Sequence, residues 1–243
     1  MVTKRYNFPT INKCCRTLAE HIVTLAQQCV RDNGEFTIAA SGGSTPRSLY
    51  RLLATPPFVD RMPWLQTHLF LGDERCVKPE HPDSNYRMIK EELLSQPLPA
   101  KCTIHRMMGE MRPEDGAIAY EQELHKFFSK DTNRPTPWPS FDMILLGLGI
   151  DGHTASLFPN SPALSEKKRW VTSTPPGILD PQVDRLTLTI PVINNASEVA
   201  FLVAGEKKHS LIEYILAQNQ PISQYPASYI SPQDKLSWFI ADV

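Results

Sequence analysis

The chain has 243 residues, of which 41% are hydrophobic and 21% charged, a balance typical of a globular protein with one substantial apolar core. The formal net charge of -1 provides no basic field to attract nucleic acid. No run of about 18 apolar residues is present to span a membrane. We therefore expect no nucleic-acid partner and no membrane partner.

The five cysteines are an odd number, and only Cys14 and Cys15 are adjacent. Their spacing matches neither a disulfide framework nor a zinc site. The first residues also lack the apolar centre of a secretory signal. We expect a reduced, cytoplasmic enzyme that forms a single α/β domain over residues 1–243.

The first predicted elements lead to a loop with the features of an anion site. Apolar residues at spacings of three and four predict an amphipathic helix from Thr10 to Asp32, with Gly34 as its C-cap. The β-prone run Phe36–Ala40 follows, then SGGSTP at residues 41–46, and then a second predicted helix.

This loop joins a strand to a helix start through two glycines and two hydroxyl residues. Gly42 and Gly43 allow a ligand to approach the backbone, and Ser44 and Thr45 offer hydroxyl groups beside the free N–H groups of the helix. The pattern favours phosphate, and a glycine-rich capping turn is the alternative. Neither the Walker nor the dinucleotide pattern is present, so no nucleotide is expected.

A second buried strand, His68–Leu71, runs directly into three charged residues, Asp73, Glu74 and Arg75. The carboxyl end of such a strand is where α/β proteins bind ligands, although a solvated loop would also have this composition. The next segment, residues 81–94, is predicted to be a helix capped by Asp83 or Ser84.

The remaining pattern continues the alternation of strands and helices. Strands are predicted at Ile104–Met108, Trp170–Ser173, Arg185–Ile190, Val199–Ala204 and Leu236–Ile240, and helices at Pro113–Phe128, Pro191–Ala196 and Glu206–Ala217. Lys208 falls in the first turn of the last helix, where a cation opposes the helix dipole. It either meets a bound anion or is simply solvated.

The most informative stretch is FDMILLGLGIDGHTASLFP, residues 141–159. Its apolar run Met143–Leu146 is typical of a strand buried on both faces of a parallel sheet. Gly147 and Gly149 then permit a sharp turn before Asp151 and His153. A histidine beside a carboxylate at this position indicates general base chemistry, and an ordinary turn with a surface histidine is the alternative.

These elements predict a mostly parallel, Rossmann-like sheet flanked by helices, in which four strand ends with polar groups share one edge. No serine elbow, Cys–His pair or cluster with metal-ligand spacing competes with the Asp–His pair. We therefore expect no metal and no other cofactor.

Six motifs along the chain resemble those of the 6-phosphogluconolactonases, within the superfamily that also contains glucosamine-6-phosphate isomerases. They are SGGSTP (41–46), GDERCV (72–77), HPDSNYRM (81–88), GLGIDGHTASLFP (147–159), RLTLTIPVIN (185–194) and VAGEKK (203–208). The resemblance covers essentially the whole chain. One departure is Asn160, where the lactonases often have glycine.

The resemblance implies hydrolysis of 6-phospho-D-glucono-1,5-lactone to 6-phospho-D-gluconate in the oxidative pentose phosphate pathway. It implies that His153 activates water, that Asp151 orients it, and that Arg75 stabilises the oxyanion. It also implies substrate or phosphate contacts; the residues concerned are Gly42, Gly43, Ser44, Thr45, Asp73, Arg185 and Lys208.

Two alternatives remain. The first is a glucosamine-6-phosphate deaminase or isomerase, but those enzymes carry glutamate five residues beyond the histidine, where this chain has Phe158. The second is a non-catalytic sugar-phosphate-binding protein, against which the intact set of Asp151, His153 and Arg75 argues. Release of ammonia from glucosamine 6-phosphate would identify the deaminase.

Overall fold

The computed structural model describes residues 2–94, 102–129, 137–217 and 220–242. Its centre is a seven-stranded sheet in the order β1-β10-β9-β6-β2-β3-β5, in which all neighbouring strands are parallel. The strands are β1 (Val2–Phe8), β2 (Phe36–Ala40), β3 (Thr67–Leu71), β5 (Thr103–His105), β6 (Met143–Leu146), β9 (Glu198–Ala204) and β10 (Lys235–Ala241).

A second, antiparallel sheet of three strands has the order β4-β8-β7. Its strands are β4 (Asp73–Arg75), β7 (Val171–Thr174) and β8 (Arg185–Leu188). The helices are α1 (Ile11–Asn33), α2 (Ser44–Leu53), α3 (Phe58–Arg61), α4 (Asn85–Ile89), α5 (Pro113–Phe128), α6 (Ile190–Asn194) and α7 (His209–Leu216). Shorter helical turns are the π turn Lys90–Leu94 and the 3-10 turns Trp64–Gln66, Pro162–Ser165, Glu206–Lys208 and Pro226–Tyr229.

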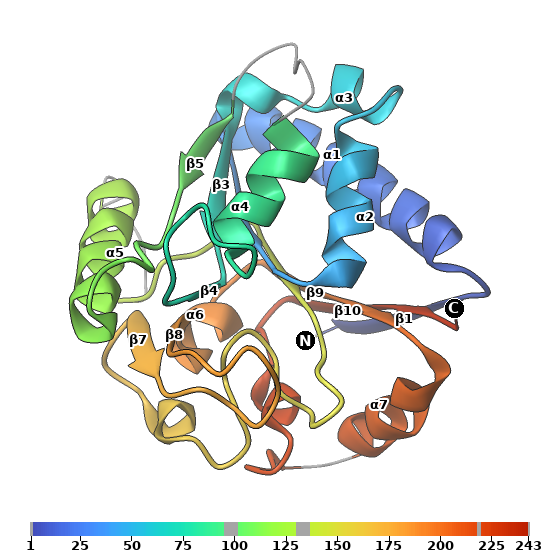
Figure 1. Ribbon diagram of the computed structural model, residues 1–243. Coiled ribbons are helices and arrows are strands. Elements are labelled where there is room, and N and C mark those ends of the chain that lie inside the picture. The colour runs from blue at the N-terminus through green and yellow to red at the C-terminus, as the bar shows by residue number, and fades with distance from the viewer. Residues whose placement is uncertain (1, 95–101, 130–136, 218–219, 243) are drawn as a thin grey trace.

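Helices cover both faces of the large sheet. In the view of Figure 1, α1, α2 and α3 lie above strands β9, β10 and β1, whereas α6 and α7 lie below them. Strands β2 and β6 are buried along their whole length, because a parallel sheet with helices on both faces exposes neither side. The buried apolar residues of both sheets and of the helices form one continuous core. The predicted α/β fold is therefore confirmed.

The first helix begins and ends where its sequence indicates. Thr10 is the N-cap, and its side-chain oxygen accepts a hydrogen bond from the backbone N–H of Lys13. Gly34 is the C-cap in the left-handed conformation, with a φ of 83°, and its N–H donates to the carbonyl of Val30. The predicted C-cap is thus confirmed.

Among the details that differ from the sequence-based expectations, three concern β1, β4 and the helix predicted from Glu206. Strand β1 was not predicted, because most of its side chains are exposed and it is recognisable only through its pairing with β10. For residues 73–75 no strand is predicted, but they form β4, which pairs with β8. The helix predicted from Glu206 is divided into a 3-10 turn, Glu206–Lys208, and the helix α7.

The order of the strands reverses between β2 and β6. From β2 the chain adds β3 and then β5 on one side, and from β6 it adds β9 and then β10 on the other. The connections that leave β2 and β6 therefore diverge, which opens a crevice beyond the carboxyl ends of these two strands. Ligands bind at such a crevice in open α/β sheets.

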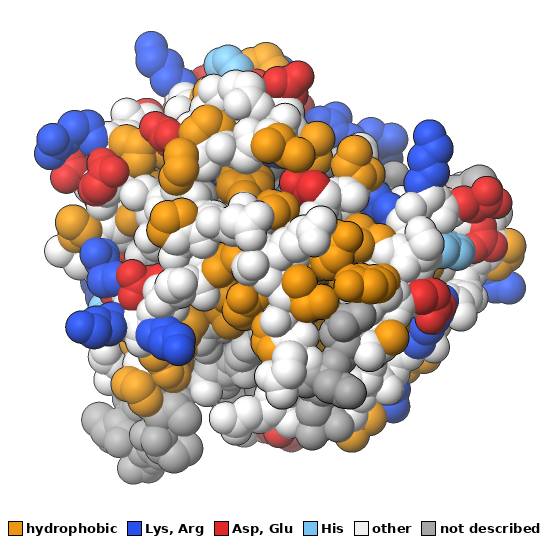
Figure 2. Space-filling model, turned by 90° about the horizontal axis from the view of Figure 1, so that it is seen from below, with side chains coloured by type: hydrophobic (Ala, Val, Ile, Leu, Met, Phe, Trp, Pro, Cys, Tyr) orange, Lys and Arg blue, Asp and Glu red, His pale blue; other side chains and the backbone are white. Residues whose placement is uncertain are grey.

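The face that lies below the sheet in Figure 1 carries mixed side chains. Figure 2 shows apolar side chains across the middle of this face, with lysine and arginine mostly near its margin. Among the described residues, no helix combines the length and the apolar character needed to cross a bilayer.

Candidate active site

A cleft of about 190 Å³ lies at the carboxyl edge of the large sheet. Its lining comes from the segments that follow four adjacent strands, β9, β6, β2 and β3. The lining residues are Ser41, Gly42, Gly43, Ser44, Thr45, Pro46, Asp73, Arg75, Asn85, Gly147, Leu148, Gly149, His153, Ala155, Leu202 and Lys208. Groups that are far apart in the sequence thus face one small space.

The segment after β2 brings the start of helix α2 to the cleft. Gly43 is the residue before the helix, and its φ of 101° is in a region that glycine adopts without strain. No side chain caps this helix, so the N–H groups of its first turn keep the capacity to bind an anion. The Tyr50 hydroxyl fixes the loop from beneath by donating to the Ser41 carbonyl at 2.7 Å.

Gly42 is required here for steric reasons. A Cβ at this position would lie 1.9 Å from Oδ1 of Asn85, so the buried Asn85 side chain would have to leave its position beside Asp73. The glycine loop and Asn85 therefore occupy directly adjoining walls of the cleft.

The segment after β6 places a histidine and a carboxylate in contact. His153 Nδ1 lies 2.5 Å from Asp151 Oδ1, and the same oxygen accepts from the His153 backbone N–H at 3.2 Å. Burial by itself would raise the pKa of Asp151, but the hydrogen bonds and charge of His153 outweigh it and hold that pKa below its usual value. Asp151 is therefore ionised at neutral pH and accepts the Nδ1 proton, so that in the neutral imidazole the lone pair is on Nε2.

The turn that carries this pair is tightly constrained. The Gly149 N–H donates to the His153 carbonyl at 2.8 Å, and the Thr154 hydroxyl donates to the Gly147 carbonyl at 2.9 Å. A Cβ on Gly149 would lie 2.2 Å from His153 Nδ1. The Phe158 ring packs against the imidazole with a centroid separation of 5.3 Å. These contacts leave the histidine ring little freedom to turn.

Asp73 links the two principal walls of the cleft. Its Oδ2 accepts a hydrogen bond of 2.7 Å from the Ser156 hydroxyl, which belongs to the segment after β6. Its Oδ1 and backbone carbonyl accept from the Asn85 amide nitrogen at 3.3 Å and 2.9 Å. All three side chains are buried, so the bonds hold these segments in a fixed relation.

Two cations reach the cleft from opposite sides. Arg75 lies on β4, and its Nη1 donates to the Asp83 carbonyl at 2.5 Å. Lys208 ends the 3-10 turn after β9, and its Nζ donates to the Leu148 carbonyl at 2.7 Å. Partial burial lowers the pKa of Lys208 from its ordinary value. An anion in the cleft would meet positive charge from both.

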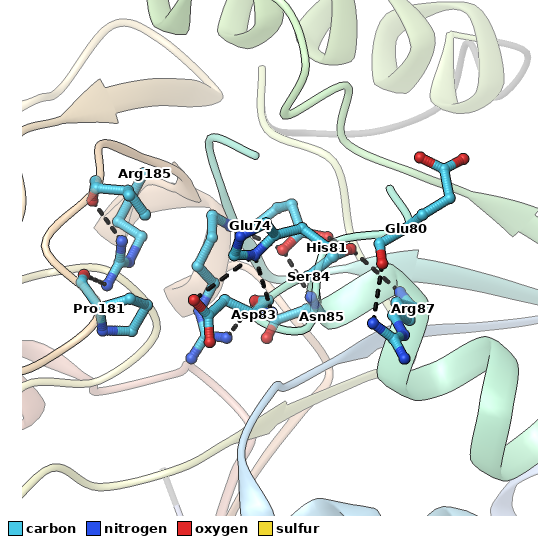
Figure 3. A network of polar contacts seen from close by, with 11 residues as sticks. Glu74, Glu80, His81, Asp83, Ser84, Asn85, Arg87, Pro181 and Arg185 are labelled. Atoms are coloured by element: carbon cyan, nitrogen blue, oxygen red, sulfur yellow. Dashed lines mark hydrogen bonds and ion pairs between the residues drawn. The ribbon is translucent and has the colours of Figure 1, made fainter. Parts of the chain in front are cut away.

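Two of the expected site residues do not line this cleft. Asp151 lies behind His153, and the Arg185 guanidinium donates to the carbonyls of Pro181, at 2.6 Å, and Val183. Figure 3 shows Arg185 turned toward Pro181 and away from Asn85. Arg185 is only 4% exposed and also lies over the Phe158 ring, 6.0 Å from its centroid. In this geometry the guanidinium supports the loop before β8, and the expected contact of Arg185 with phosphate stays a prediction.

Asn85 is a polar lining residue that the sequence did not single out. Its place in the first turn of a capped helix gave no reason to prefer it over its neighbours. The contact with Gly42 depends on a tertiary approach between α4 and the glycine loop that sequence spacing does not reveal. Across the residues that the structure describes, no three His, Cys, Asp or Glu side chains are grouped so as to hold a metal ion.

Comparison with known proteins agrees with this geometry. The family described as glucosamine-6-phosphate isomerases/6-phosphogluconolactonase matches residues 9–238. A 6-phosphogluconolactonase of Synechocystis sp. is 44% identical over 220 residues, which are 90% of this chain and 87% of that protein. A chloroplastic 6-phosphogluconolactonase of Arabidopsis thaliana is 36% identical over 92% of this chain and 68% of its own length.

A solved structure of 6-phosphogluconolactonase from Thermotoga maritima is 30% identical, with a TM-score of 0.82 over 99% of this chain and 100% of that chain. A structure titled devB protein is 32% identical, with a TM-score of 0.85 over 99% of this chain and 97% of that one. From the sequence match and the shared fold together, we conclude that the chain belongs to the glucosamine-6-phosphate isomerase/6-phosphogluconolactonase family.

Proposed function

We propose that this protein is a 6-phosphogluconolactonase, which hydrolyses 6-phospho-D-glucono-1,5-lactone to 6-phospho-D-gluconate. The names of its relatives support this reaction. The observation that carries it is the juxtaposition, in one cleft, of a carboxylate-bound histidine and an uncapped helix start that can hold phosphate.

The first step is the attack of water on C1 of the lactone. Asp151 accepts the Nδ1 proton of His153, so Nε2 is free to take a proton from that water. The oxygen of the water then bonds to C1, and the electron pair of the carbonyl π bond moves to the carbonyl oxygen. Asp151 stabilises the imidazolium that forms.

The second step expels the ring oxygen. Arg75 of β4 lines the cleft, and we assign to it the stabilisation of the oxyanion on C1. Its electron pair re-forms the carbonyl as the C1–O5 bond breaks, and the imidazolium returns its proton to O5. A δ-lactone is already reactive, so this degree of assistance suffices without a covalent intermediate.

The phosphate group sits, in this proposal, at the start of α2. Backbone N–H groups and the hydroxyls of Ser44 and Thr45 would hold its oxygens, and Lys208 would provide the opposing charge. Gly42 and Gly43 provide the open backbone for this contact. Asp73, beside them, is placed to accept hydrogen bonds from sugar hydroxyls.

Phe158 supports hydrolysis over the amine chemistry of the other branch of the family. It is buried, and its ring packs on His153, so the position that would need a carboxylate for deamination holds an apolar ring.

All five cysteines are free thiols, which supports the expectation of a reducing, cytoplasmic compartment.

The proposal is tested with freshly generated 6-phosphogluconolactone, with proton release followed above the spontaneous rate. Unphosphorylated glucono-1,5-lactone is the matched comparison, and its kcat/KM is expected to be lower by about 10²-fold or more, because phosphate binding positions the carbonyl. No acceleration of the phosphorylated lactone, or release of ammonia from glucosamine 6-phosphate, would overturn the assignment.

A further inference from the structure

Glu74 occupies an unusual place between two residues that line the cleft. Successive side chains of a strand point to opposite faces, so Asp73 and Arg75 face the cleft while Glu74 points into the protein. Glu74 is 2% exposed and does not line the cleft. It cannot touch the substrate, and the mechanism above gives it no part.

The Glu74 carboxylate accepts four hydrogen bonds, one from the next residue of β4 and three from residues 84–86. Oε1 accepts from the backbone N–H groups of Arg75 and Asn85, both at 2.7 Å. Oε2 accepts from the Tyr86 N–H at 2.8 Å and from the Ser84 hydroxyl at 3.0 Å. Figure 3 shows Glu74 beside Ser84 and Asn85 at the start of α4. All four donors are uncharged.

This arrangement is costly to maintain. Burial raises the pKa of Glu74 above its ordinary value, although the three backbone N–H bonds act in the opposite direction. A buried carboxylate without a cationic partner stabilises a protein less than an apolar residue of similar size would. Its presence calls for a reason other than stability.

The contacts of the neighbouring residues provide that reason. Asp83, which immediately precedes the segment held by Glu74, accepts the 2.5 Å hydrogen bond from Arg75 Nη1. Asn85, within the segment, donates to the Asp73 carbonyl at 2.9 Å and fills the space beside Gly42. Glu74 therefore ties β4 to the segment that fixes both a cleft cation and the wall of the glycine loop.

We propose that Glu74 is a positioning residue for the hydrolytic reaction, which acts through Arg75 by holding residues 83–86 against β4. The effect on the reaction rests on the proposed function, whereas the contacts of Glu74 with residues 84–86 do not. Glu74 stabilises the transition state only through Arg75, so its substitution should not lower kcat further when Arg75 is absent.

Glu74→Gln is the informative variant. It keeps the size and two acceptor sites, but its NH2 group confronts the N–H of Tyr86 where the carboxylate accepted a hydrogen bond. Residues 83–86 should shift, and the Arg75 guanidinium should shift with them. Because a displacement of about 1 Å can cost about 10²-fold in rate, we expect kcat to fall by about 10–100-fold while KM changes by less than about threefold.

A double-mutant cycle separates positioning from simple structural damage. Glu74→Gln is measured alone and in the Arg75→Ala background, and the expected effect on kcat in that background is less than about threefold. The matched control is Glu198→Gln. Glu198 is another buried carboxylate that accepts several hydrogen bonds, and its substitution should change kcat by the same factor whether or not Arg75 is present. If Glu74→Gln also lowers kcat by the same factor with and without Arg75, the proposal is overturned.

Two further measurements test the proposal if the Glu74→Gln variant does not fold or if the wild-type protein has no lactonase activity. Should Glu74→Gln fail to fold, Ser84→Ala, which removes one bond to Oε2, replaces it in the cycle and the same criterion applies. Should the wild-type protein fail to hydrolyse the lactone, the proposed function fails, and the cycle is repeated on the Kd of 6-phosphogluconate. Coupling between residues 74 and 75 in that binding cycle supports positioning, and its absence overturns it.

Discussion

A single carboxylate determines what His153 can do. In the proposed mechanism, the 2.5 Å contact between Asp151 and Nδ1 keeps the ring proton on Nδ1, so that Nε2 of the neutral imidazole acts as the base. Because the pKa of Asp151 is held below its usual value, the carboxylate is ionised at neutral pH and can accept the Nδ1 proton. The histidine would lose its orientation if the carboxylate were replaced by an apolar group.

We predict that His153→Ala lowers kcat by about 10²–10⁴-fold, which is the usual contribution of a positioned general base. Binding of 6-phosphogluconate should change little, because the phosphate contacts remain. The control is His125→Ala on α5, whose exposed ring stacks on Trp170 and does not line the cleft. Near-wild-type kcat in His153→Ala, after subtraction of spontaneous hydrolysis, would disprove the assignment.

The adjacent lysines Lys207 and Lys208 form a natural matched pair. Lys208 lines the cleft, whereas Lys207 is exposed and does not. Lys208→Ala should raise KM by about 10-fold or more and change kcat by less than about threefold, because phosphate is bound in the ground and transition states alike. Steady-state kinetics of both alanine variants test this, and equal KM values would remove Lys208 from the phosphate site.

At the scale of the elements, the turn after β6 depends on its small residues. Gly149→Ala is expected to lower kcat by about 10²-fold or more, since the new Cβ would displace the ring of His153 from Asp151. Gly34→Ala is the contrasting change, because it strains a helix C-cap with a φ of 83° in open space.

The two glycine variants should differ in the property that they lose, which is stability for Gly34→Ala and kcat for Gly149→Ala. Gly34→Ala should lower the free energy of unfolding by about 1 kcal/mol and leave kcat unaltered. Urea unfolding and initial rates for both variants measure the difference. If Gly149→Ala loses stability but keeps its kcat, the turn does not position the histidine as described.

The elements that could be predicted from sequence are those whose signals are local. Strand β6 and helix α5 have the predicted bounds, because an unbroken apolar run and a proline-initiated amphipathic pattern identify them. Strands β1 and β4 could not be predicted, since polar and charged residues dominate both. Each becomes a strand only through a partner far along the chain, β10 for one and β8 for the other.

The same distinction applies to the cleft. Gly42, Asp73, His153 and Lys208 could be proposed because each follows a predicted strand, and parallel strands share one carboxyl edge. Spacing cannot show the direction of a side chain, however. The Arg185 guanidinium lies on backbone carbonyls, and the contributions of Asn85 and Glu74 depend on how α4 docks against β4.

At the scale of the whole molecule, a second buried carboxylate lies at the opposite edge of the sheet. Glu198, at the start of β9, accepts hydrogen bonds from His21 of α1 at 2.9 Å and from Lys235 of β10 at 2.8 Å. Burial by itself would raise the pKa of Glu198, but these partners outweigh it and lower that pKa. The contact joins a helix to two strands far from the cleft.

This contact should make stability dependent on pH. Because the folded-state pKa of Glu198 lies below the unfolded value of about 4.3, its contribution is present above that pH and is lost as the pH falls through the folded-state pKa. Glu198→Gln should lower the free energy of unfolding by about 1–3 kcal/mol at pH 7.

Urea unfolding of wild type and Glu198→Gln, from neutral pH to below about pH 4, measures this dependence. The gap between the two proteins should narrow as the pH falls, while kcat at neutral pH stays unaltered. A gap that is constant with pH would show that the ionisation of Glu198 does not contribute.

The pairing of β1 with β10 has a consequence for synthesis on the ribosome. Val2 pairs with Lys235 and Phe8 with Ala241, so residues 2–8 can find their partner only after residues 235–241 have emerged. During that interval β1 is an unpaired strand with free backbone groups, which invites association with other chains. The exposed, charged side chains of Lys4 and Arg5 oppose such association. The same charged residues that make β1 difficult to predict from sequence therefore also disfavour aggregation of the nascent chain.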